Sequence, residues 1–292
     1  MKYTSIVACF AFALALAFAV VSATAEDPSW TRPFPVFRIT GHLYYVGSEE
    51  LASYLVVTPD GLILINSNLA ASVPEIRKNI ELLGFKFSDI KILLISQGHF
   101  DHCAGSAEIL RETGAKYYVM KQDVDVVESG GRTDFYYAHD KSTWFEPAKV
   151  DHALEDGEQV KLGGTMLTAH LTAGHNKGTT TWTLDQVENG RTLHVVIVGG
   201  PNVNKGYKLV GNAEYPQIAD DFAHGFDVLQ KLPCDIFLGA HGSYFGLQDK
   251  FDRYHKGGGE AFIDPHGYHA YIADRRRAFE KELKRQRAHA DY

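Results

Sequence analysis

Apolar and polar residues follow one another in short runs that predict strands and helices in turn. Residues 39–47 and 53–67 are rich in β-branched and aromatic residues, and T-P-D-G at 58–61 predicts a tight hairpin. Residues 73–84 carry apolar side chains at helical spacing and end at glycine. A strand, a helix and a strand follow at 91–96, 104–114 and 116–120. This order predicts a layered α/β domain whose helices cover a sheet.

A second set of apolar runs begins near residue 150 and repeats this pattern loosely. Strands are predicted at 157–162, 165–173, 179–184, 194–198 and 235–240, and a helix at 220–232. Two β-rich halves, each closed by helices, predict a four-layer αβ/βα sandwich. No segment resembles a linker, so we expect residues 26–292 to form a single domain.

The chain ends in a predicted helix at 270–287 that contains a cluster of arginines. We interpret this cluster as a solvated helix face on which Glu280 pairs with Lys284 one turn later, rather than as a binding patch.

The first 25 residues differ from the rest of the chain. Lys2 precedes a run of apolar residues, and small residues follow at Ala23 and Ala25. This pattern predicts a secretory signal that is cleaved after Ala25. The apolar run is shorter than the roughly 20 residues that a membrane-spanning helix needs, which argues against an uncleaved anchor. We therefore expect a periplasmic or secreted protein with no membrane contact after cleavage.

Cysteine content and charge narrow the class of protein further. Removing residues 1–25 removes Cys9 and leaves Cys103 and Cys234, which we expect to be unpaired thiols because nothing in the sequence brings them together. The formal net charge of −7 disfavours nucleic acid as a partner, since a phosphate backbone requires a clustered positive surface.

Three segments share one design, in which an apolar run is followed by small residues and then by histidine. They are K-I-L-L-I-S-Q-G-H-F-D-H at 91–102, T-A-H-L-T-A-G-H ending at His175, and D-I-F-L-G-A-H ending at His241. Functional groups of layered α/β proteins gather beyond the carboxyl ends of strands, so these loops are expected to converge. The first segment is the most specific, because packing does not require Gln97, His99, Asp101 and His102 together in one loop.

Imidazole and carboxylate ligands without thiolate favour zinc over manganese or iron. Six such groups divide into two sets of three, and each set leaves a coordination position for water, as catalytic metal sites do. Water between two metals is a strong nucleophile at neutral pH, so hydrolysis is the reaction class that such a site serves.

These segments resemble the metallo-β-lactamase superfamily, whose pattern is H-x-H-x-D-H followed by two later histidines. Further stretches, among them S-G-G-R-T-D-F at 129–135 and L-T-A-G-H-N-K-G-T-T-T-W-T at 171–183, are similar to the third subclass of the class B β-lactamases. The resemblance covers nearly the whole chain after residue 25. It implies the metallo-β-lactamase fold and a zinc-dependent enzyme that acts on small β-lactam substrates and gives antibiotic resistance.

The resemblance also implies how the six residues are used. The first zinc would be bound by Gln97, His99 and His175, and the second by Asp101, His102 and His241. The metals would polarise the β-lactam carbonyl and supply hydroxide, while Asp101 orients the attacking water. The stretch at 196–207 contains neither the cysteine of the other subclasses nor the bridging aspartate of many non-lactamase relatives.

Two departures from the family pattern lead to specific expectations. Gln97 stands where the pattern has histidine, and its neutral carbonyl oxygen is a weaker zinc ligand than imidazole, so we expect a weaker first site. Pro201, Asn202, Val203, Asn204 and Lys205 stand where relatives often place serines that contact the substrate carboxylate.

Two alternatives to a β-lactamase remain open at this stage. One is a hydrolase of the same fold that acts on a lactone, thioester or phosphodiester, and the other is a non-catalytic zinc-binding protein. We expect a monomer.

Overall fold

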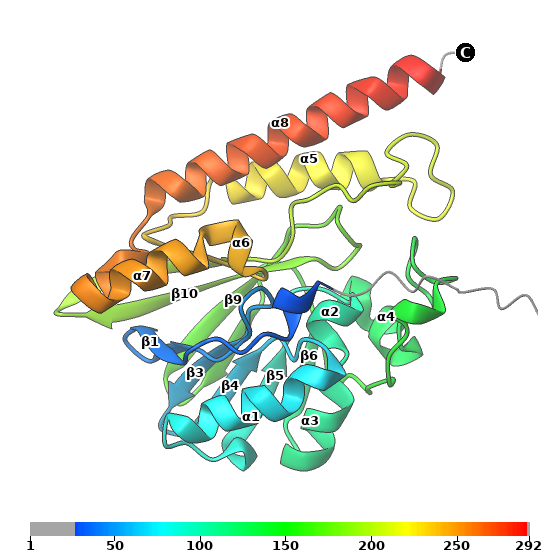
Figure 1. Cartoon of the computed structure of the whole chain (residues 1–292). Coiled ribbons are helices and arrows are strands. Elements are labelled where there is room, and N and C mark those ends of the chain that lie inside the picture. Colours follow the sequence, from blue (N-terminus) through cyan, green and yellow to red (C-terminus); the bar gives the residue numbers. More distant parts are fainter. Residues whose placement is uncertain (1–26, 291–292) are drawn as a thin grey trace, which may run out of the picture.

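Two β-sheets lie face to face in the middle of the molecule, and helices cover the outer face of each sheet (Figure 1). A computed structural model describes residues 27–290, so the predicted signal sequence lies outside the described residues. Helices α1 and α3 lie on one side of the molecule and α5 and α8 on the other (Figure 1). This arrangement confirms the predicted four-layer αβ/βα sandwich.

The first sheet contains seven strands in the order in which they occur along the chain. They are β1 (Phe37–Thr40), β2 (Leu43–Tyr45), β3 (Tyr54–Thr58), β4 (Gly61–Ile65), β5 (Ile90–Leu94), β6 (Lys116–Met120) and β7 (His152–Leu154). Strands β1 to β4 are antiparallel, and β4 to β7 are parallel to one another. The carboxyl ends of β4, β5 and β6 therefore lie at the same edge. The predicted hairpin is confirmed, because Thr58 pairs with Gly61 across the turn.

The second sheet contains five strands in the order β12-β11-β10-β9-β8. They are β8 (Gln159–Leu162), β9 (Thr165–Leu171), β10 (Thr180–Glu188), β11 (Arg191–Val198) and β12 (Ile236–Gly239). Strands β8 to β11 form an antiparallel meander, and β12 joins β11 in parallel. All five strands were predicted within a few residues.

The described residues also form eight α-helices. They are α1 (Val73–Leu82), α2 (Phe100–Cys103), α3 (Ser106–Thr113), α4 (Val124–Ser129), α5 (Ile218–Leu229), α6 (Gly242–Phe245), α7 (Leu247–Gly257) and α8 (Pro265–Ala290). The helix predicted at 104–114 corresponds to α3, which ends where Gly114 adopts a left-handed conformation with φ +67°. Helices α6 and α7 were not predicted.

The apolar core is divided by the first sheet. One cluster fills the space between the sheets and extends to α5 and α8, whereas the other lies between the first sheet and helices α1 and α3. Trp182 of β10 is fully buried in the first cluster, and its indole N–H donates a 3.1 Å hydrogen bond to the carbonyl of Ile95, just after β5. This contact joins the two sheets directly beneath the loop that begins with Ser96 and Gln97.

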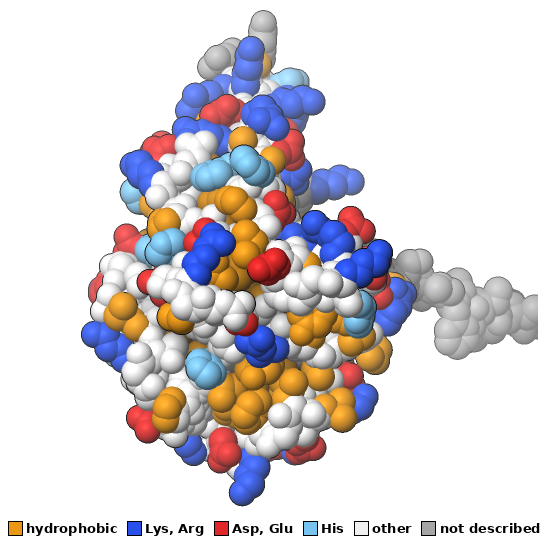
Figure 2. Space-filling model, turned by 90° about the vertical axis from the view of Figure 1, so that its left-hand side faces the viewer, with side chains coloured by type: hydrophobic (Ala, Val, Ile, Leu, Met, Phe, Trp, Pro, Cys, Tyr) orange, Lys and Arg blue, Asp and Glu red, His pale blue; other side chains and the backbone are white. Residues whose placement is uncertain are grey.

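Lys and Arg side chains gather around the upper part of the molecule, where α8 lies (Figure 2). The predicted pair of Glu280 with Lys284 is wrong, because Glu280 pairs with Arg276 one turn earlier. Arg276 also contacts Asp227 of α5 at 2.8 Å, which draws its side chain toward the neighbouring helix. Among residues 27–290, α8 and the other helices all lack the length or the apolar character needed to cross a membrane.

The two cysteines within the described residues are unpaired, as predicted. Cys103 is buried in α2, and its thiol lies 3.1 Å from the carbonyl oxygen of His99. Cys234 is half-buried ahead of β12.

Replacing Trp182 with alanine tests the contact between the sheets. We expect Trp182→Ala to lower the free energy of unfolding by about 3–5 kcal/mol, because a large buried side chain is removed. Guanidinium unfolding of the metal-free protein measures this change. Val187→Ala on the same strand is the control, because Val187 is 66% exposed and its truncation should change stability by less than about 0.5 kcal/mol. Equal effects of the two substitutions would contradict this account of the core.

Candidate metal centre

The three predicted loops meet at one edge of the two sheets. Gln97, His99, Asp101 and His102 follow β5 of the first sheet, whereas His175 follows β9 and His241 follows β12 of the second. The rings of His99 and His175 lie 4.9 Å apart between centroids, and those of His102 and His241 lie 4.8 Å apart. The structure therefore brings the six residues together, whereas their use as metal ligands stays a prediction.

Short helices set the direction of the ligand side chains. His99 has an extended backbone and begins α2, so Asp101 and His102 lie on the first turn of that helix. The backbone N–H of His102 donates to the carbonyl of His99 at 3.0 Å and closes the turn. His241 begins α6 in the same way, with φ −119° and ψ 143°. Each strand thus ends in a turn that directs its histidine toward the other sheet.

The first group consists of Gln97, His99 and His175, all of them buried. A Cβ atom at Gly200 would lie 3.3 Å from both the Gln97 Nε2 and the His175 Cδ2. The Gln97 amide and the His175 imidazole therefore both pack against Gly200. The Nδ1–H of His175 donates to the carbonyl of Asn202 at 2.7 Å, which leaves Nε2 available as a ligand atom.

The second group consists of Asp101, His102 and His241, whose ligand atoms all lie within 4.8 Å of one another. The Asp101 Oδ2 is 3.3 Å from the His102 Nε2 and 3.5 Å from the His241 Nε2. The Nδ1 of His241 is 3.3 Å from the Glu50 carboxylate, so Glu50 holds the ring with its other nitrogen toward Asp101.

Several buried polar atoms of both groups have no hydrogen-bond partner. They are Gln97 Oε1 and Nε2 and both ring nitrogens of His102, whereas the His99 Nε2, also unpartnered, lies beside the Asp134 carboxylate. A buried polar atom left unpaired costs about 1–3 kcal/mol, so such clusters need a ligand that satisfies them. One oxygen and two nitrogens in the first group, and one carboxylate and two nitrogens in the second, form a donor set that fits zinc.

Electrostatics shift the pKa values of these side chains in different directions. Burial opposes protonation of His99, yet the neighbouring Asp134 carboxylate raises its pKa above the usual value. Burial, together with the neighbouring His99, lowers the pKa of His175 to about 3, so this imidazole is free of a proton at neutral pH. Burial alone would raise the pKa of Asp101, but His102 and His241 hold it well below its usual range. Burial opposes protonation of His241, yet Asp101 and Glu50 raise its pKa to about 9. A metal ion beside Asp101 would displace this proton.

Asp134 supports His99 from the loop after α4. Its Oδ1 accepts hydrogen bonds from the backbone N–H groups of Tyr136 and Tyr137 at 2.8 and 2.6 Å. Its Oδ2 lies 3.3 Å from the His99 Nε2 in a close charge contact, and neither atom has another hydrogen-bond partner. This nitrogen faces a carboxylate, so Nδ1 is the atom of His99 that is left for a metal.

Asp123, just after β6, connects the loops of the two sheets. Its carboxylate accepts hydrogen bonds from the Gly98 N–H at 2.7 Å, the Asn176 amide at 2.9 Å and the Gly178 N–H at 2.9 Å. Burial nevertheless raises its pKa to about 6. Gly98 lies between Gln97 and His99, and Asn176 follows His175, so a single carboxylate fixes both parts of the first group.

A cavity of about 270 Å³ opens onto the site. His99, Asp101, His175 and His241 line it together with the aromatic side chains of Trp30, Phe100, Tyr137 and Tyr244, the carboxylate of Glu50, and Asn202 and Asn204. An apolar wall around a few convergent polar groups is the usual form of a small-molecule site.

The supporting residues Glu50, Asp123, Asp134 and Asn202 were not assigned these positions from the sequence. Asp123 follows a parallel strand, so the rule that found Gln97 applies equally to it. The other three reach the site through contacts between segments distant in sequence, which no local pattern indicates.

Comparison with known proteins agrees with this fold. A family profile described as the metallo-beta-lactamase superfamily matches residues 51–194. The native FEZ-1 metallo-beta-lactamase from Legionella gormanii is 54% identical, with a TM-score of 0.87 over 88% of this chain and 98% of that chain.

Two further structures are similar at lower identity. BJP-1, a subclass B3 metallo-beta-lactamase of Bradyrhizobium japonicum, is 34% identical, with a TM-score of 0.84 over 90% of this chain and 98% of that chain. LRA-12, a class B3 di-zinc metallo-beta-lactamase from an Alaskan soil metagenome, is 36% identical, with a TM-score of 0.84 over 89% and 98%.

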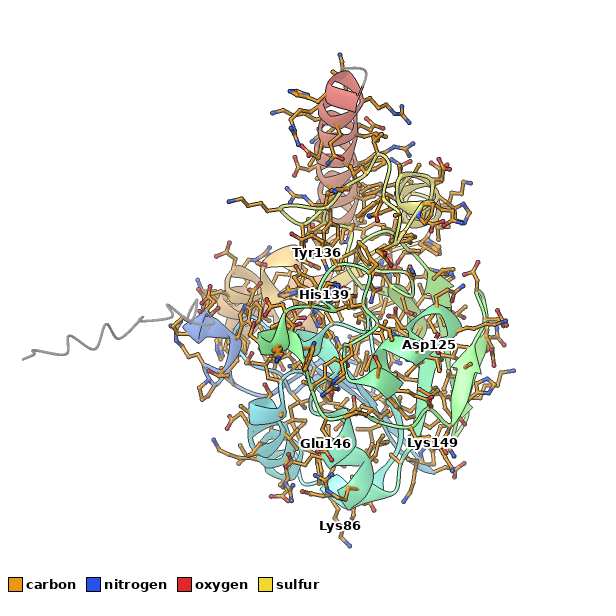
Figure 3. The ribbon with its side chains drawn as sticks, turned by 90° about the vertical axis from the view of Figure 1, so that its right-hand side faces the viewer. Lys86, Asp125, Tyr136, His139, Glu146 and Lys149 are labelled. Carbon is orange, nitrogen blue, oxygen red and sulfur yellow. The ribbon has the colours of Figure 1, made fainter. Side chains whose placement is uncertain are left out.

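Removing the charge of Asp123 tests its part in holding the loops. We expect Asp123→Asn to lower the free energy of unfolding of the metal-free protein by about 1–3 kcal/mol, because an amide cannot accept all three hydrogen bonds. Urea unfolding at pH 8, where Asp123 is ionised, measures this change. The control is Asp125→Asn, which alters an exposed aspartate on the surface in Figure 3. Similar losses in both variants would contradict the account.

Proposed function

Because the chain belongs to the metallo-β-lactamase superfamily and resembles its subclass B3 members, we propose that it hydrolyses the amide bond of β-lactam antibiotics. The observation that carries this proposal is the convergence of six buried ligand-type side chains, several of whose polar atoms have no partner. The enzyme would thereby give resistance to these antibiotics.

Two zinc ions are the proposed cofactors. Gln97, His99 and His175 would hold the first ion, and Asp101, His102 and His241 the second. When bound, zinc polarises the amide carbonyl and lowers the pKa of water, and it stabilises the negative charge that develops during hydrolysis.

Asp101 is the proposed catalytic residue. Its carboxylate lies between His102 and His241 and lines the cavity, so it can accept a hydrogen bond from the attacking water and orient it. The low pKa of Asp101 keeps this carboxylate ionised and able to accept that bond at neutral pH. Glu50 acts through His241 and is a positioning residue.

The substrate would lie against the aromatic side of the cavity. Trp30 and Phe100 pack with ring centroids 6.0 Å apart and provide an apolar surface beside Asp101. Asn204 also lines this cavity, and its amide donates to the Tyr137 hydroxyl at 3.0 Å. Asn204 therefore faces the cavity with a polar group suited to the substrate carboxylate.

The first zinc site is proposed to be the weaker one. Gln97 supplies a neutral oxygen, whereas Asp101 supplies a charged oxygen to the second site. Zinc would fill the second site first, and the protein would work with a single zinc when the metal is scarce. The apolar segment before Ala25 supports export, so we place this chemistry in the periplasm or outside the cell.

A hydrolysis assay tests the function directly. We expect chelator-sensitive turnover of a penicillin, a cephalosporin or a carbapenem, with much slower turnover of a lactone and a phosphodiester. Asp101→Asn at saturating zinc should lower kcat/KM about a hundredfold or more, because the attacking water loses its orienting carboxylate. Asp60→Asn, at an exposed turn, is the matched control. Full activity of the Asp101 variant, or zinc binding without any turnover, would refute the proposal.

Zinc titration tests the difference between the two sites. We expect the wild-type protein to bind two equivalents with unequal affinity, and Gln97→His to tighten the weaker step while preserving fold and hydrolysis. Calorimetry on metal-free protein measures both affinities. Two equivalents bound equally tightly by the wild type would contradict a weak first site.

A further inference from the structure

Tyr244 brings a hydroxyl group to the cavity at the metal centre, and the mechanism described above does not use it. Tyr244 lies in α6, three positions after His241, and its backbone N–H donates to the His241 carbonyl at 3.1 Å. The two ring centroids are 4.9 Å apart, and both residues line the cavity of about 270 Å³. The phenol ring of Tyr244 therefore lies beside the second group of ligand-type residues.

The direction of the hydrogen bond to Tyr244 follows from Arg275 of α8. A guanidinium group only donates hydrogen bonds, so the Asn202 side-chain atom that contacts Arg275 at 3.3 Å is the carbonyl oxygen. The amide nitrogen of Asn202 is then turned toward the Tyr244 hydroxyl and donates to it at 3.0 Å. Arg275 thus fixes the orientation of the amide, and the Tyr244 oxygen is the acceptor in this contact.

The proton of the Tyr244 hydroxyl is not used by the protein. Among residues 27–290, no polar atom accepts a hydrogen bond from this hydroxyl. A tyrosine keeps its proton at neutral pH, since its ordinary pKa is about 10. A phenol that accepts one hydrogen bond can still donate another. Tyr244 therefore offers a free donor to a molecule that occupies the cavity.

The other tyrosines around the centre are placed differently. The Tyr207 hydroxyl donates to the His175 carbonyl at 2.9 Å, and Tyr207 does not line the cavity. Tyr137 lines it beside the first group, where its ring centroid is 5.2 Å from that of His99. Two phenols thus flank the centre, with Tyr137 beside the first group and Tyr244 beside the second.

Hydrolysis of an amide places negative charge on its nitrogen. The water oxygen bonds to the carbonyl carbon, the C–N bond breaks with its electron pair on nitrogen, and one proton of the water is left for that nitrogen. In the proposed function Asp101 orients this water, so the nitrogen must lie within reach of the Asp101 carboxylate. The Asp101 Oδ2 is 3.5 Å from the His241 Nε2, which favours the Tyr244 side of the cavity over the Tyr137 side.

We propose that Tyr244 is a further catalytic residue, whose hydroxyl donates a hydrogen bond to the β-lactam nitrogen as the C–N bond breaks. This inference rests on the proposed function. The hydrogen bond strengthens as charge develops on nitrogen, so it stabilises the transition state more than the bound substrate. Asn202 holds the phenol oxygen in place, and the proton stays on Tyr244 throughout.

Two cephalosporins whose nitrogens carry negative charge unequally well test the inference. Both have the same acyl side chain. On the double bond of the six-membered ring, one has a methyl group and the other a dinitrostyryl group, which is conjugated with the nitrogen and spreads its charge. The measured quantity is the rate constant of ring opening in a single turnover, with enzyme in excess at saturating zinc. A donor to nitrogen matters most where the substrate cannot delocalise the charge.

Tyr244→Phe removes the hydroxyl and keeps the ring. We expect it to lower the rate constant about ten- to a hundredfold for the methyl compound and about twofold or less for the conjugated one. Tyr271→Phe is the matched control, because the Tyr271 ring centroid is 5.4 Å from that of Tyr244 but Tyr271 does not line the cavity. It should leave both rate constants at their wild-type values. Zinc content and urea unfolding should match the wild type in both variants.

The possible outcomes are distinct. Equal losses on the two compounds, or no loss on either, would overturn the role of Tyr244 at the nitrogen while leaving β-lactam hydrolysis intact. Equal losses in Tyr244→Phe and Tyr271→Phe would overturn it as well. If the wild-type protein opens neither compound, the proposed function fails and the inference fails with it.

Discussion

The arrangement of the candidate metal centre depends on the hydrogen bonds that the Asp123 carboxylate accepts. The two sheets each contribute ligand-type residues, so the loops after β5 and β9 must be held at a fixed separation. Asp123 accepts hydrogen bonds from Gly98 in one loop and from Asn176 and Gly178 in the other. The backbone N–H of Thr180 adds a 2.7 Å bond to the carbonyl of Ser96 below them. These bonds place Gln97 and His99 beside His175.

Unpaired polar atoms at the edge where the two sheets meet the candidate metal centre destabilise the metal-free fold. Most polar groups inside a protein are paired, yet Gln97 and His102 have two unpartnered atoms each in the interior. Part of the free energy gained elsewhere in the core therefore compensates for an arrangement that becomes favourable when an ion occupies it. Glu50, Asp134 and Asn202 contribute by fixing the orientation of three imidazole rings before the ion arrives.

Much of the fold could be predicted from the local sequence pattern. The elements and contacts that this pattern did not predict were missed for physical reasons. The spacing of apolar residues and the residue types at turns predicted both sheets, because apolar runs such as residues 90–94 are long and end at small or polar residues. Helices α6 and α7 were missed because α6 has only one turn and α7 has a largely polar surface. The Glu280 ion pair was assigned to the wrong turn because Arg276 is drawn toward α5, a contact that the helix alone does not indicate.

The candidate centre was predictable to a similar degree. Strand ends indicated where Gln97, His99, Asp101, His102, His175 and His241 would meet, since parallel strands end at one edge. The partners that orient them could not be predicted in this way. Glu50 and His241 are separated by most of the chain, and only packing of the two sheets brings them within 3.3 Å.

Anomalous diffraction at the zinc edge from crystals grown with saturating zinc tests the central claim most directly. The account predicts two zinc peaks roughly 3.5–4 Å apart, as in other two-metal sites, with the Gln97 side-chain oxygen bound to one ion and Asp101 to the other. A single peak at saturating zinc, or a Gln97 amide turned away from both ions, would contradict it.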